Sequence, residues 1–378
     1  MADLFDDIAP VDCLMDPIAG MDEPRAFRNK IASPFAPDRA ALAKARRTHS
    51  GPRAKHPSIP LSSIRCGLFA AGTHRIVEVE QCLVEHPVGR QVIAAVRSLI
   101  AKYGVAPYDE DRQQGFLRYV VVRVGHASGE VLVTLVTAAD AFPGTRNFCR
   151  ELVRRVPAVT TVVQNVNTQV TNAIMGRAEH VLYGPGFILD TLCGLSFRIS
   201  SQSFYQVNAM QTEVLYRTAM DYAGLDAQAA PTIVDAYCGT GTIGLVAASI
   251  APNAQVIGVD KVASAIEDAR GNARHNGIGN ATFVAEDATP FMRRLAAEGT
   301  SVDVVFLDPP RAGSTPEFLQ AAAALEPQRI VYISCNPETQ ARDAEELARY
   351  GYRAVRMRAV DMFPHTPHIE NVALFARG

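Results

Sequence analysis

The sequence predicts two domains, an α+β domain followed by an α/β domain with a doubly wound parallel sheet. Three observations predict this fold class. Strand-like segments separated by turn residues dominate residues 67–195, and single strands alternate with helical patterns after about residue 201. Three glycines spaced G-x-G-x-x-G follow the first strand of this second region, where the chain must turn sharply into a helix. Regular alternation of strands and helices is typical of a parallel sheet.

The composition is that of a folded chain without a membrane segment. Its 378 residues are enough for two domains, and with 48% hydrophobic and 20% charged residues it can bury a sizeable core. A formal net charge of −2 means that a nucleic acid would have to be bound by local basic surface. No apolar run approaches about 18 residues, and the first ten residues are acidic where a signal peptide would be basic. We therefore expect a cytoplasmic protein.

The cysteines do not form the pattern of a disulfide framework or a zinc site. They are odd in number, scattered, and never spaced as C-x-x-C, which fits a reduced protein. The seven positions are Cys13, Cys66, Cys82, Cys149, Cys193, Cys238 and Cys335.

The N-terminal part is expected to comprise a tail and a domain. Residues 1–24 are acidic, rich in Pro and Gly and without periodicity, so we predict a flexible tail. Residues 25–200 form the α+β domain, with helices at Gly89–Tyr103 and Phe142–Val156 and an antiparallel hairpin that turns at Gly125–Gly129. The basic segment 36–60 fits two interpretations equally, a solvated linker or an arm that contacts phosphates.

Residues 201–378 form the α/β domain. Its strands are expected to alternate with helices up to the last segment, which can return as a final strand. The predicted strands are Thr232–Ala236, Gln255–Asp260, Thr282–Ala285, Val302–Leu307, Arg329–Ile333 and Val372–Ala376.

The glycine-rich motif runs from Asp235 to Gly244 and reads DAYCGTGTIG. Asp260 ends the next strand, where a carboxylate can accept hydrogen bonds from both ribose hydroxyls of an adenosine ligand. Domains that bind NAD and domains that bind S-adenosylmethionine share these features, and a purely structural strand-to-helix turn would also explain the glycines.

Two further acidic residues follow predicted strands. Asp287 lies where it could reach an adenine amino group, although an ordinary helix cap explains it equally well. Asp308 precedes Pro309 and Pro310, which fix an extended turn and direct Asp308 into the crevice at the edge of the sheet. Asp-Pro-Pro is similar to an element of methyltransferases that act on planar bases.

Cys335 lies between a buried strand and a helical pattern over about 338–350. The crevice at the carboxyl ends of parallel strands is where α/β sheets bind ligands, and a helix N-terminus favours a thiolate. A small packing cysteine is the alternative. Glu370 follows 35 positions later, directly before the last strand; alone it would read as a surface carboxylate. His365 and His368 have the spacing of metal ligands, but no further ligands are apparent, so we predict no metal.

Together these motifs identify the chain as similar to the RNA (uracil-5-)-methyltransferase family, and closest to its bacterial 23S rRNA branch. The resemblance covers nearly everything after residue 25, and SCNP followed by HIEN is its most specific part. The matching segments are RNK (28–30), GTHRIVEVEQC (72–82), GFLRYVVVR (115–123), SFYQVN (203–208), DAYCGTGTIG (235–244), Asp260, FLDPPRAG (306–313), YISCNPETQARD (332–343) and HIENV (368–372).

The resemblance implies a class I methyltransferase domain with a Rossmann-like sheet, preceded by an RNA-binding α+β domain. It implies that Cys335 is the nucleophile that adds to uracil C6 and that Glu370 is the general base that removes the C5 proton. Asp308 could instead orient the uracil. The residues that would contact S-adenosylmethionine are Gln206, Tyr237, Thr242, Asp260, Asp287 and Asp308.

Some members of the family hold an iron–sulfur cluster on four cysteines. Cys82 matches the fourth of these, but the chain before it holds only Cys13 and Cys66, so the three closely spaced cysteines are missing and we predict no cluster here.

We therefore expect an S-adenosylmethionine-dependent 23S rRNA uridine C5-methyltransferase that acts as a monomer in the cytoplasm. A tRNA uridine C5-methyltransferase is the nearest alternative. A NAD-dependent oxidoreductase and a non-catalytic RNA-binding protein are more distant ones.

Overall fold

The structure, a computed structural model, describes residues 13–48, 58–142, 144–226 and 230–377. The chain divides into two compact units. Unit 1 comprises Met1–Pro24, Leu192–Phe197 and Asn208–Gly378, and unit 2 comprises Arg25–Thr191 and Arg198–Val207. The predicted domain boundary after residue 200 therefore differs from that of the units, because Leu192–Phe197 belongs to unit 1 and residues 201–207 belong to unit 2.

Unit 1 contains eight strands and six helices among its described residues, apart from the hairpin strands β9 (Phe187–Leu192) and β10 (Leu195–Ser200), which span the boundary between the units. The strands are β1 (Leu14–Ala19), β11 (Thr232–Ala236), β12 (Gln255–Asp260), β13 (Ala281–Ala285), β14 (Val304–Leu307), β15 (Arg329–Ser334), β16 (Tyr352–Val360) and β17 (Glu370–Arg377). The helices are α5 (Ala209–Ala223), α6 (Thr242–Ile250), α7 (Ala263–His275), α8 (Ala288–Ala297), α9 (Pro316–Ala324) and α10 (Pro337–Arg349).

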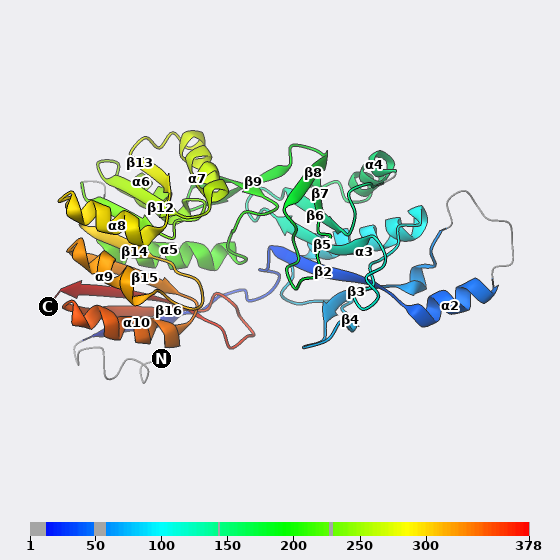
Figure 1. Ribbon diagram of the computed structural model, residues 1–378, viewed down its shortest axis with the longest axis horizontal. Helices are drawn as coiled ribbons and strands as arrows, with labels where there is room; N and C mark the ends of the chain where they lie inside the picture. The colour runs from blue at the N-terminus through cyan, green and yellow to red at the C-terminus, as the bar shows by residue number, and fades with distance from the viewer. Residues whose placement is uncertain (1–12, 49–57, 143, 227–229, 378) are drawn as a thin grey trace. The chain divides into compact units, whose positions relative to one another are not determined.

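These strands form one sheet in the order β1-β16-β17-β15-β14-β11-β12-β13. The five strands from β15 to β13 are parallel, whereas β17 is antiparallel to both of its neighbours. Helices cover both faces of the sheet: α8 packs on α9 and α9 on α10, while α5 packs on α6 (Figure 1). The predicted doubly wound α/β fold is confirmed, and its five parallel strands agree with the predicted ones to within two residues.

The strand β16 was not predicted. Its sequence YRAVRMRAV carries three arginines, which conceal the apolar positions Tyr352, Ala354 and Met357 that face the core. The strand also contains a bulge between Ala354 and Arg356, which interrupts the regular alternation of buried and exposed positions.

The expectation of a flexible tail over residues 1–24 is wrong for residues 14–19. They form β1, which pairs in parallel with β16 at the edge of the sheet. Asp16 anchors this strand, because its carboxylate accepts a hydrogen bond from the Tyr222 hydroxyl at 2.9 Å and lies 2.9 Å from the Arg356 guanidinium. Residues 1–12 of the expected tail lie outside the described residues.

Unit 2 is the α+β domain. Its seven-stranded sheet has the order β4-β3-β2-β5-β6-β7-β8, and only the β6–β7 pair is parallel. The two long helices α3 and α4 pack on one face and enclose an apolar core. The elements are β2 (Lys30–Pro37), α2 (Arg39–Thr48), the short 3-10 helix Leu61–Ser63, β3 (Ile64–Phe69), β4 (Ile76–Glu78), α3 (Pro87–Tyr103), β5 (Leu117–Val124), β6 (Val131–Thr137), α4 (Thr145–Arg155), β7 (Val159–Val166) and β8 (Ala178–Tyr183).

Both predicted helices of this unit and the predicted β5–β6 hairpin are present. The hairpin turn is held by Asp190, whose carboxylate accepts hydrogen bonds from the backbone N–H groups of His126 and Ala127 at 2.9 and 2.8 Å.

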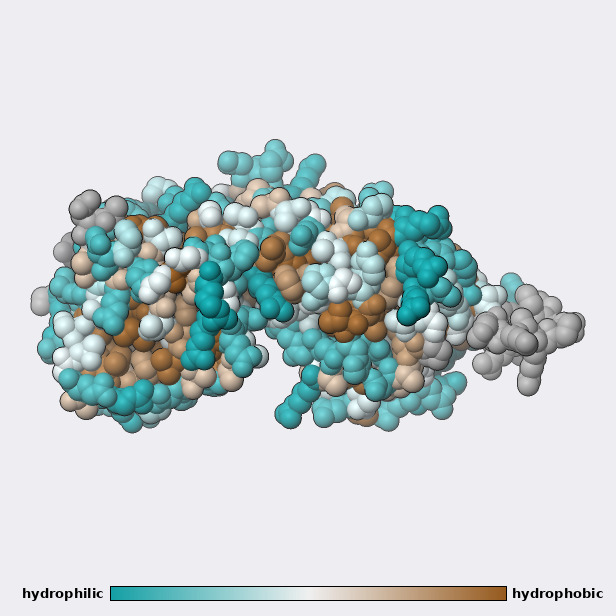
Figure 2. All heavy atoms as spheres, turned by 90° about the horizontal axis from the view of Figure 1, so that it is seen from above, coloured by the Kyte–Doolittle hydropathy of each residue, from teal (hydrophilic) through white to brown (hydrophobic). Residues whose placement is uncertain are grey.

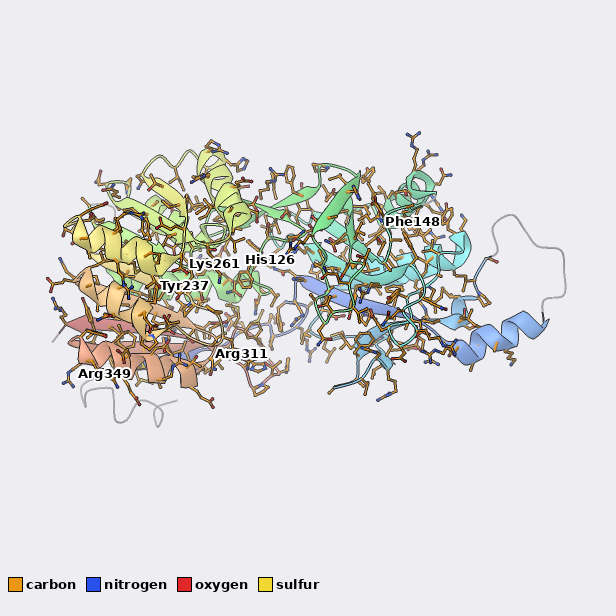
Figure 3. The ribbon with its side chains drawn as sticks, viewed as in Figure 1. His126, Phe148, Tyr237, Lys261, Arg311 and Arg349 are labelled. Carbon is orange, nitrogen blue, oxygen red and sulfur yellow. The ribbon has the colours of Figure 1, made fainter. Side chains whose placement is uncertain are left out.

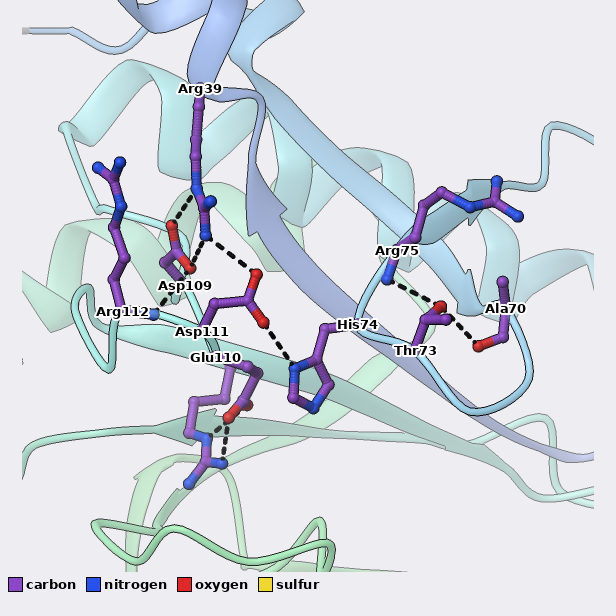
Figure 4. Close-up of polar contacts among 10 residues, drawn as sticks. Arg39, Ala70, Thr73, His74, Arg75, Asp109, Glu110, Asp111 and Arg112 are labelled. Carbon is purple, nitrogen blue, oxygen red and sulfur yellow. Dashed lines mark hydrogen bonds and ion pairs between the residues drawn. The ribbon is translucent and has the colours of Figure 1, made fainter.

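The described part of the basic segment 36–60 includes α2. Its first residue, Arg39, forms a bidentate ion pair with Asp109 and a further contact with Asp111 at 3.1 Å, and His74 also meets Asp111 (Figure 4). The Arg39 charge is therefore compensated within the protein, which weakens the interpretation as a phosphate-contacting arm at this residue. Residues 49–57 of the segment lie outside the described residues.

Among the described residues, no helix is long and apolar enough to cross a membrane. The face of the molecule in Figure 2 mixes hydrophilic and apolar side chains.

We predict that Asp16→Asn destabilises the protein by about 1–2 kcal/mol, because it weakens the contacts of a largely buried carboxylate with Tyr222 and Arg356. Chemical denaturation of the full chain measures this. Asp22→Asn, at an exposed neighbouring position, serves as the control and should change stability by less than about 0.5 kcal/mol. Equal stability of the two variants would mean that β1 is not docked on the sheet.

Candidate functional site

The centre of the candidate site is the junction of β15 and β17. Ser334 pairs with Asn371 and Ile333 with Val372 in an antiparallel register. Continuing this register by one position brings Cys335 opposite Glu370. Opposite residues in an antiparallel pair point to the same face, with their Cβ atoms about 4.5–5.5 Å apart. The charge of Glu370 acts on the Cys335 thiol, so two residues 35 positions apart in the sequence lie near each other.

Asp308 completes this group from the next strand. Leu307, the last residue of β14, pairs with Tyr332 of β15, so Asp308 emerges beside the end of β15. The charge of Asp308 acts on both Cys335 and Glu370 and raises the pKa of each. The structure therefore brings together three of the predicted site residues at the carboxyl ends of the parallel strands.

The Cys335 thiol ionises less readily than its place before a helix N-terminus predicts. Partial burial raises its pKa, and the carboxyl groups of Glu370 and Asp308 raise it further. Arg311 acts in the opposite direction. Burial and the two acidic neighbours together exceed the lowering effect of Arg311, because a thiolate beside carboxylates is electrostatically unfavourable.

The two carboxyl groups are themselves strongly perturbed. Glu370 is 4% exposed, and burial together with the charge of Asp308 raises its pKa to about 8. Burial raises the pKa of Asp308 to about 7. Both acids therefore exchange protons near neutral pH, which is the range in which a general base works best.

Hydrogen bonds on the other side of the sheet fix the register of this junction. The Asn371 amide donates to Gln340 Oε1 at 2.6 Å, and the Gln340 amide donates to the Tyr332 carbonyl at 2.9 Å. This relay ties β17 to α10 and α10 to β15. In the turn after β15, Ser334 Oγ accepts from the Asn336 N–H at 3.1 Å, and Asn336 caps α10 by accepting from the Glu338 N–H.

The glycine-rich loop links β11 to α6 as predicted. Asp235 is fully buried and accepts a hydrogen bond from the Gly244 N–H at 2.7 Å, and a Cβ at Gly244 would lie 2.9 Å from that carboxylate oxygen. Gly241 has φ +79 and packs so closely that a Cβ would lie 2.8 Å from the Phe283 ring. These two glycines are thus required by the turn itself.

Asp260 lies at the end of β12, next to this loop. Its carboxylate accepts from the Gly239 N–H at 3.1 Å and from the Val262 N–H at 2.8 Å. A carboxylate has about four acceptor positions, so two bonds leave capacity for ribose hydroxyls. Lys261, the next residue, and Tyr237, which follows the neighbouring strand β11, lie at the same end of the sheet (Figure 3).

Tyr237 and Thr242 border the loop. Tyr237 has a φ of +61, and its ring packs on Phe318 with a centroid distance of 4.9 Å. Thr242 is the first residue of α6, and its hydroxyl lies 3.0 Å from that of Tyr216. The side chain is thus held at a helix N-terminus, a position that suits a carboxylate ligand.

The remaining two predicted residues are placed differently. Asp287 caps α8 by accepting a hydrogen bond from the Thr289 N–H at 2.9 Å, so its role as an acidic cap is confirmed. Contact with adenine stays a prediction. Gln206 belongs to unit 2, where its carbonyl accepts a hydrogen bond from the Asn29 amide at 3.0 Å.

The site has the properties that an adenosine ligand with an amino-acid end needs. Asp235 Oδ1 is buried without a hydrogen-bond partner among the described residues, and Asp260 keeps acceptor capacity. Binding of S-adenosylmethionine by the predicted residues of unit 1 stays a prediction for Tyr237, Thr242, Asp260, Asp287 and Asp308. In the described part of the chain, no group of three or more His, Cys, Asp or Glu residues could hold a metal ion.

Sequence reasoning missed three residues of this site. Arg311 is the positive group that lowers the pKa of Cys335, and it follows the two prolines of the Asp308 turn (Figure 3). Gln340 and Asn371 were quoted only as parts of motifs. Their polar character at buried positions was the available signal, because a buried amide must find partners.

Known proteins resemble this chain along its whole length. A family model described as tRNA (uracil-5-)-methyltransferase matches residues 167–377. A protein of Lactiplantibacillus plantarum named as an uncharacterized RNA methyltransferase is 39% identical over 378 residues, which are 100% of this chain and 77% of that protein. A similarly named protein of Halalkalibacterium halodurans is 38% identical over 358 residues, covering 95% of this chain and 72% of the relative.

A solved structure is also similar. The Pyrococcus abyssi tRNA (uracil-54, C5)-methyltransferase in complex with S-adenosyl-L-homocysteine superposes with a TM-score of 0.75 and 27% identity, covering 99% of this chain and 81% of that chain.

We predict that Glu370→Gln stabilises the protein more at about pH 8 than at about pH 5. The folded pKa of about 8 lies above the ordinary value of 4.5, so the carboxyl costs stability progressively as pH rises between these values. The gain from removing it should grow by about 1–3 kcal/mol across this range in denaturant titrations.

The control is Glu267→Gln, which removes an exposed carboxyl from α7. Its effect should be the same at both pH values. A pH-independent effect of Glu370→Gln as well would show that the Glu370 pKa is not raised.

Proposed function

Because the chain belongs to the RNA (uracil-5-)-methyltransferase family, whose methyl donor is S-adenosylmethionine, we propose that it methylates uridine C5 in 23S rRNA through a covalent adduct between Cys335 and uracil C6. The observation that supports this proposal is that Cys335 directly follows the β15–β17 ladder, where the charges of Glu370 and Asp308 act on its thiol. A thiol, a carboxyl that titrates near neutral pH and a second carboxyl form the group that this chemistry requires.

Uracil C5 is a weak nucleophile, and Cys335 would activate it. The thiolate adds to C6, and the electrons of the C5–C6 double bond move toward C5 and O4 to form an enolate. Since burial and two carboxyls raise the pKa of the thiol, Arg311 would stabilise the thiolate as the S–C6 bond forms. A uridine in structured RNA must leave its stack to reach this junction.

S-adenosylmethionine supplies the methyl group that the C5 carbanion accepts. Glu370 then removes the C5 proton, the electrons of the C5–H bond restore the double bond, and the Cys335 thiolate leaves C6. A carboxyl with a pKa of about 8 is well matched to this proton transfer. Asp308 would donate or accept a hydrogen bond at the uracil edge or at the cofactor, and its pKa of about 7 permits either state.

The choice of 23S rRNA rests on the segments of unit 2 that resemble the rRNA branch of the family. A tRNA is the second candidate, and the similarity to an archaeal tRNA (uracil-54, C5)-methyltransferase favours it. Mass spectrometry of both RNAs from a strain lacking the gene separates the two. Loss of 5-methyluridine from 23S rRNA alone supports our proposal, and loss from tRNA alone overturns it.

The NAD-dependent oxidoreductase and the non-catalytic RNA-binding protein, the two more distant alternatives, have less support. The family match accounts for the G-x-G-x-x-G loop and Asp260 without a nicotinamide. A non-catalytic RNA-binding protein would not need Cys335 and Glu370 to be paired. We further propose that the protein works as a cytoplasmic monomer.

We predict a denaturation-resistant protein–RNA adduct when the full chain is incubated with S-adenosylmethionine and a 23S rRNA fragment that contains 5-fluorouridine. Fluorine at C5 cannot leave as a proton, so the elimination step stops and the Cys335–C6 bond persists. Gel electrophoresis under denaturing conditions measures the adduct, and Cys335→Ala should abolish it.

Cys149→Ala provides the matched control and should keep the adduct, because Cys149 lies on α4 in the apolar core of unit 2. With unmodified RNA, Glu370→Gln should accumulate the adduct and lower turnover by about 10²–10⁴-fold. An adduct that still forms with Cys335→Ala would show that Cys335 is not the nucleophile.

A further inference from the structure

Unit 2 contains a cluster of three cations on one face of its sheet. Lys30 on β2 and Arg123 on β5 are directly paired in the antiparallel register, so their side chains lie on the same face. Arg28 lies two positions before Lys30, and its charge acts on the Lys30 ammonium. The backbone of Arg28 is fixed by hydrogen bonds to Val84 and His86. We call Arg28, Lys30 and Arg123 the β2–β5 cation cluster.

No carboxylate of the described residues compensates this cluster. Lys30 has no ion pair in the described part of the chain, and the only charges that shift its pKa are those of Arg123 and Arg28. Glu85 forms a backbone bridge with Arg28, but its carboxylate pairs with Arg90 at 3.4 Å. Burial and the two arginines lower the pKa of Lys30 to about 8.

Arg123 is the buried member of the cluster. Only 5% of it is exposed, one guanidinium nitrogen donates to the Ser203 carbonyl, and its Nε has no hydrogen-bond partner among the described residues. Burial lowers the pKa of this guanidinium to about 10. A buried cation without a counter-ion is costly unless an anion compensates it.

We propose that the β2–β5 cation cluster binds a phosphodiester group of the RNA backbone. Lys30 and Arg28 contact the phosphate oxygens, and Arg123 lies behind them as a fixed positive charge. The backbone ladder between β2 and β5 holds the cations together before the anion arrives, so little reorganisation is needed on binding. This site deepens the function proposed above and depends on RNA being the substrate.

The site gives RNA binding a specific salt and pH dependence. Each phosphate that is neutralised releases counter-ions and adds about 0.7 to the slope of log K against log salt for single strands. Because the anion favours the charged ammonium, binding is strongest below the free Lys30 pKa of about 8 and weakens as pH rises above it.

The test measures binding of a fluorescent oligocytidylate to the full chain by anisotropy, between about 50 and 200 mM salt and at about pH 7 and pH 9. Cytosine does not titrate in this range. Lys30→Gln should weaken binding several-fold and reduce the salt slope by about 0.7. Lys30→Arg should keep the slope and remove the loss of affinity at pH 9.

Lys102→Gln is the matched control, since it removes the same charge from the same unit at a lysine that pairs with Glu151 at 2.6 Å. It should leave the salt slope unchanged. Equal slopes for Lys30→Gln and Lys102→Gln would overturn the proposal, and so would weaker binding by Lys30→Gln with the wild-type slope.

These experiments test the phosphate site and the covalent mechanism separately. Oligocytidylate contains no uridine, so its binding does not depend on the covalent step. If the 5-fluorouridine adduct does not form but the Lys30 slope effect is present, the covalent mechanism is wrong and the phosphate site stands. If the adduct forms but Lys30→Gln leaves the salt slope unchanged, the phosphate site is wrong and the covalent mechanism stands.

Discussion

The antiparallel pairing of β17 with β15 is the constraint on which the functional site depends. A purely parallel sheet would deliver Cys335 and Asp308 to one edge but would leave Glu370 at the other end of its strand. Because β17 runs in the opposite direction, its first residue rather than its last meets the end of β15. The strand β16 and, beyond it, β1 cover the far side of β17, so the reversed strand is internal and its register is fixed.

The acids near this junction are electrostatically unfavourable when they are all ionised. Asp235, Asp308 and Glu370 are all carboxyls with raised pKa values, and burial is the largest cause for each. Ionising all three acids at neutral pH would place negative charges in positions from which water is largely excluded. These groups therefore reduce the stability of the fold. Groups whose pKa values are shifted by burial and by each other are typical of sites that transfer protons. The relay from Asn371 through Gln340 to the Tyr332 carbonyl holds the strands in place against this repulsion.

Most of the parallel sheet could be predicted from its sequence, because buried strands such as Val304–Leu307 are continuous apolar runs between turns. The strands β1 and β16 could not, since Pro17 and three arginines hide their pattern and their pairing is formed between segments more than 300 residues apart. Motifs identified Cys335 and Glu370 but not their register. The raised thiol pKa was not predictable either, because the position of the two carboxyls becomes apparent only when the sheet is assembled.

A disulfide trap tests the pairing of Cys335 with position 370 most directly. Opposite residues in an antiparallel pair have Cα atoms about 4.5–5.5 Å apart, which is within the range that a disulfide spans. Mild oxidation of the Glu370→Cys variant, followed by digestion and mass spectrometry, should therefore give a peptide pair linked between Cys335 and position 370. A folded variant in which both thiols stay free, or in which Cys335 links elsewhere, would contradict the register and with it the account of the site.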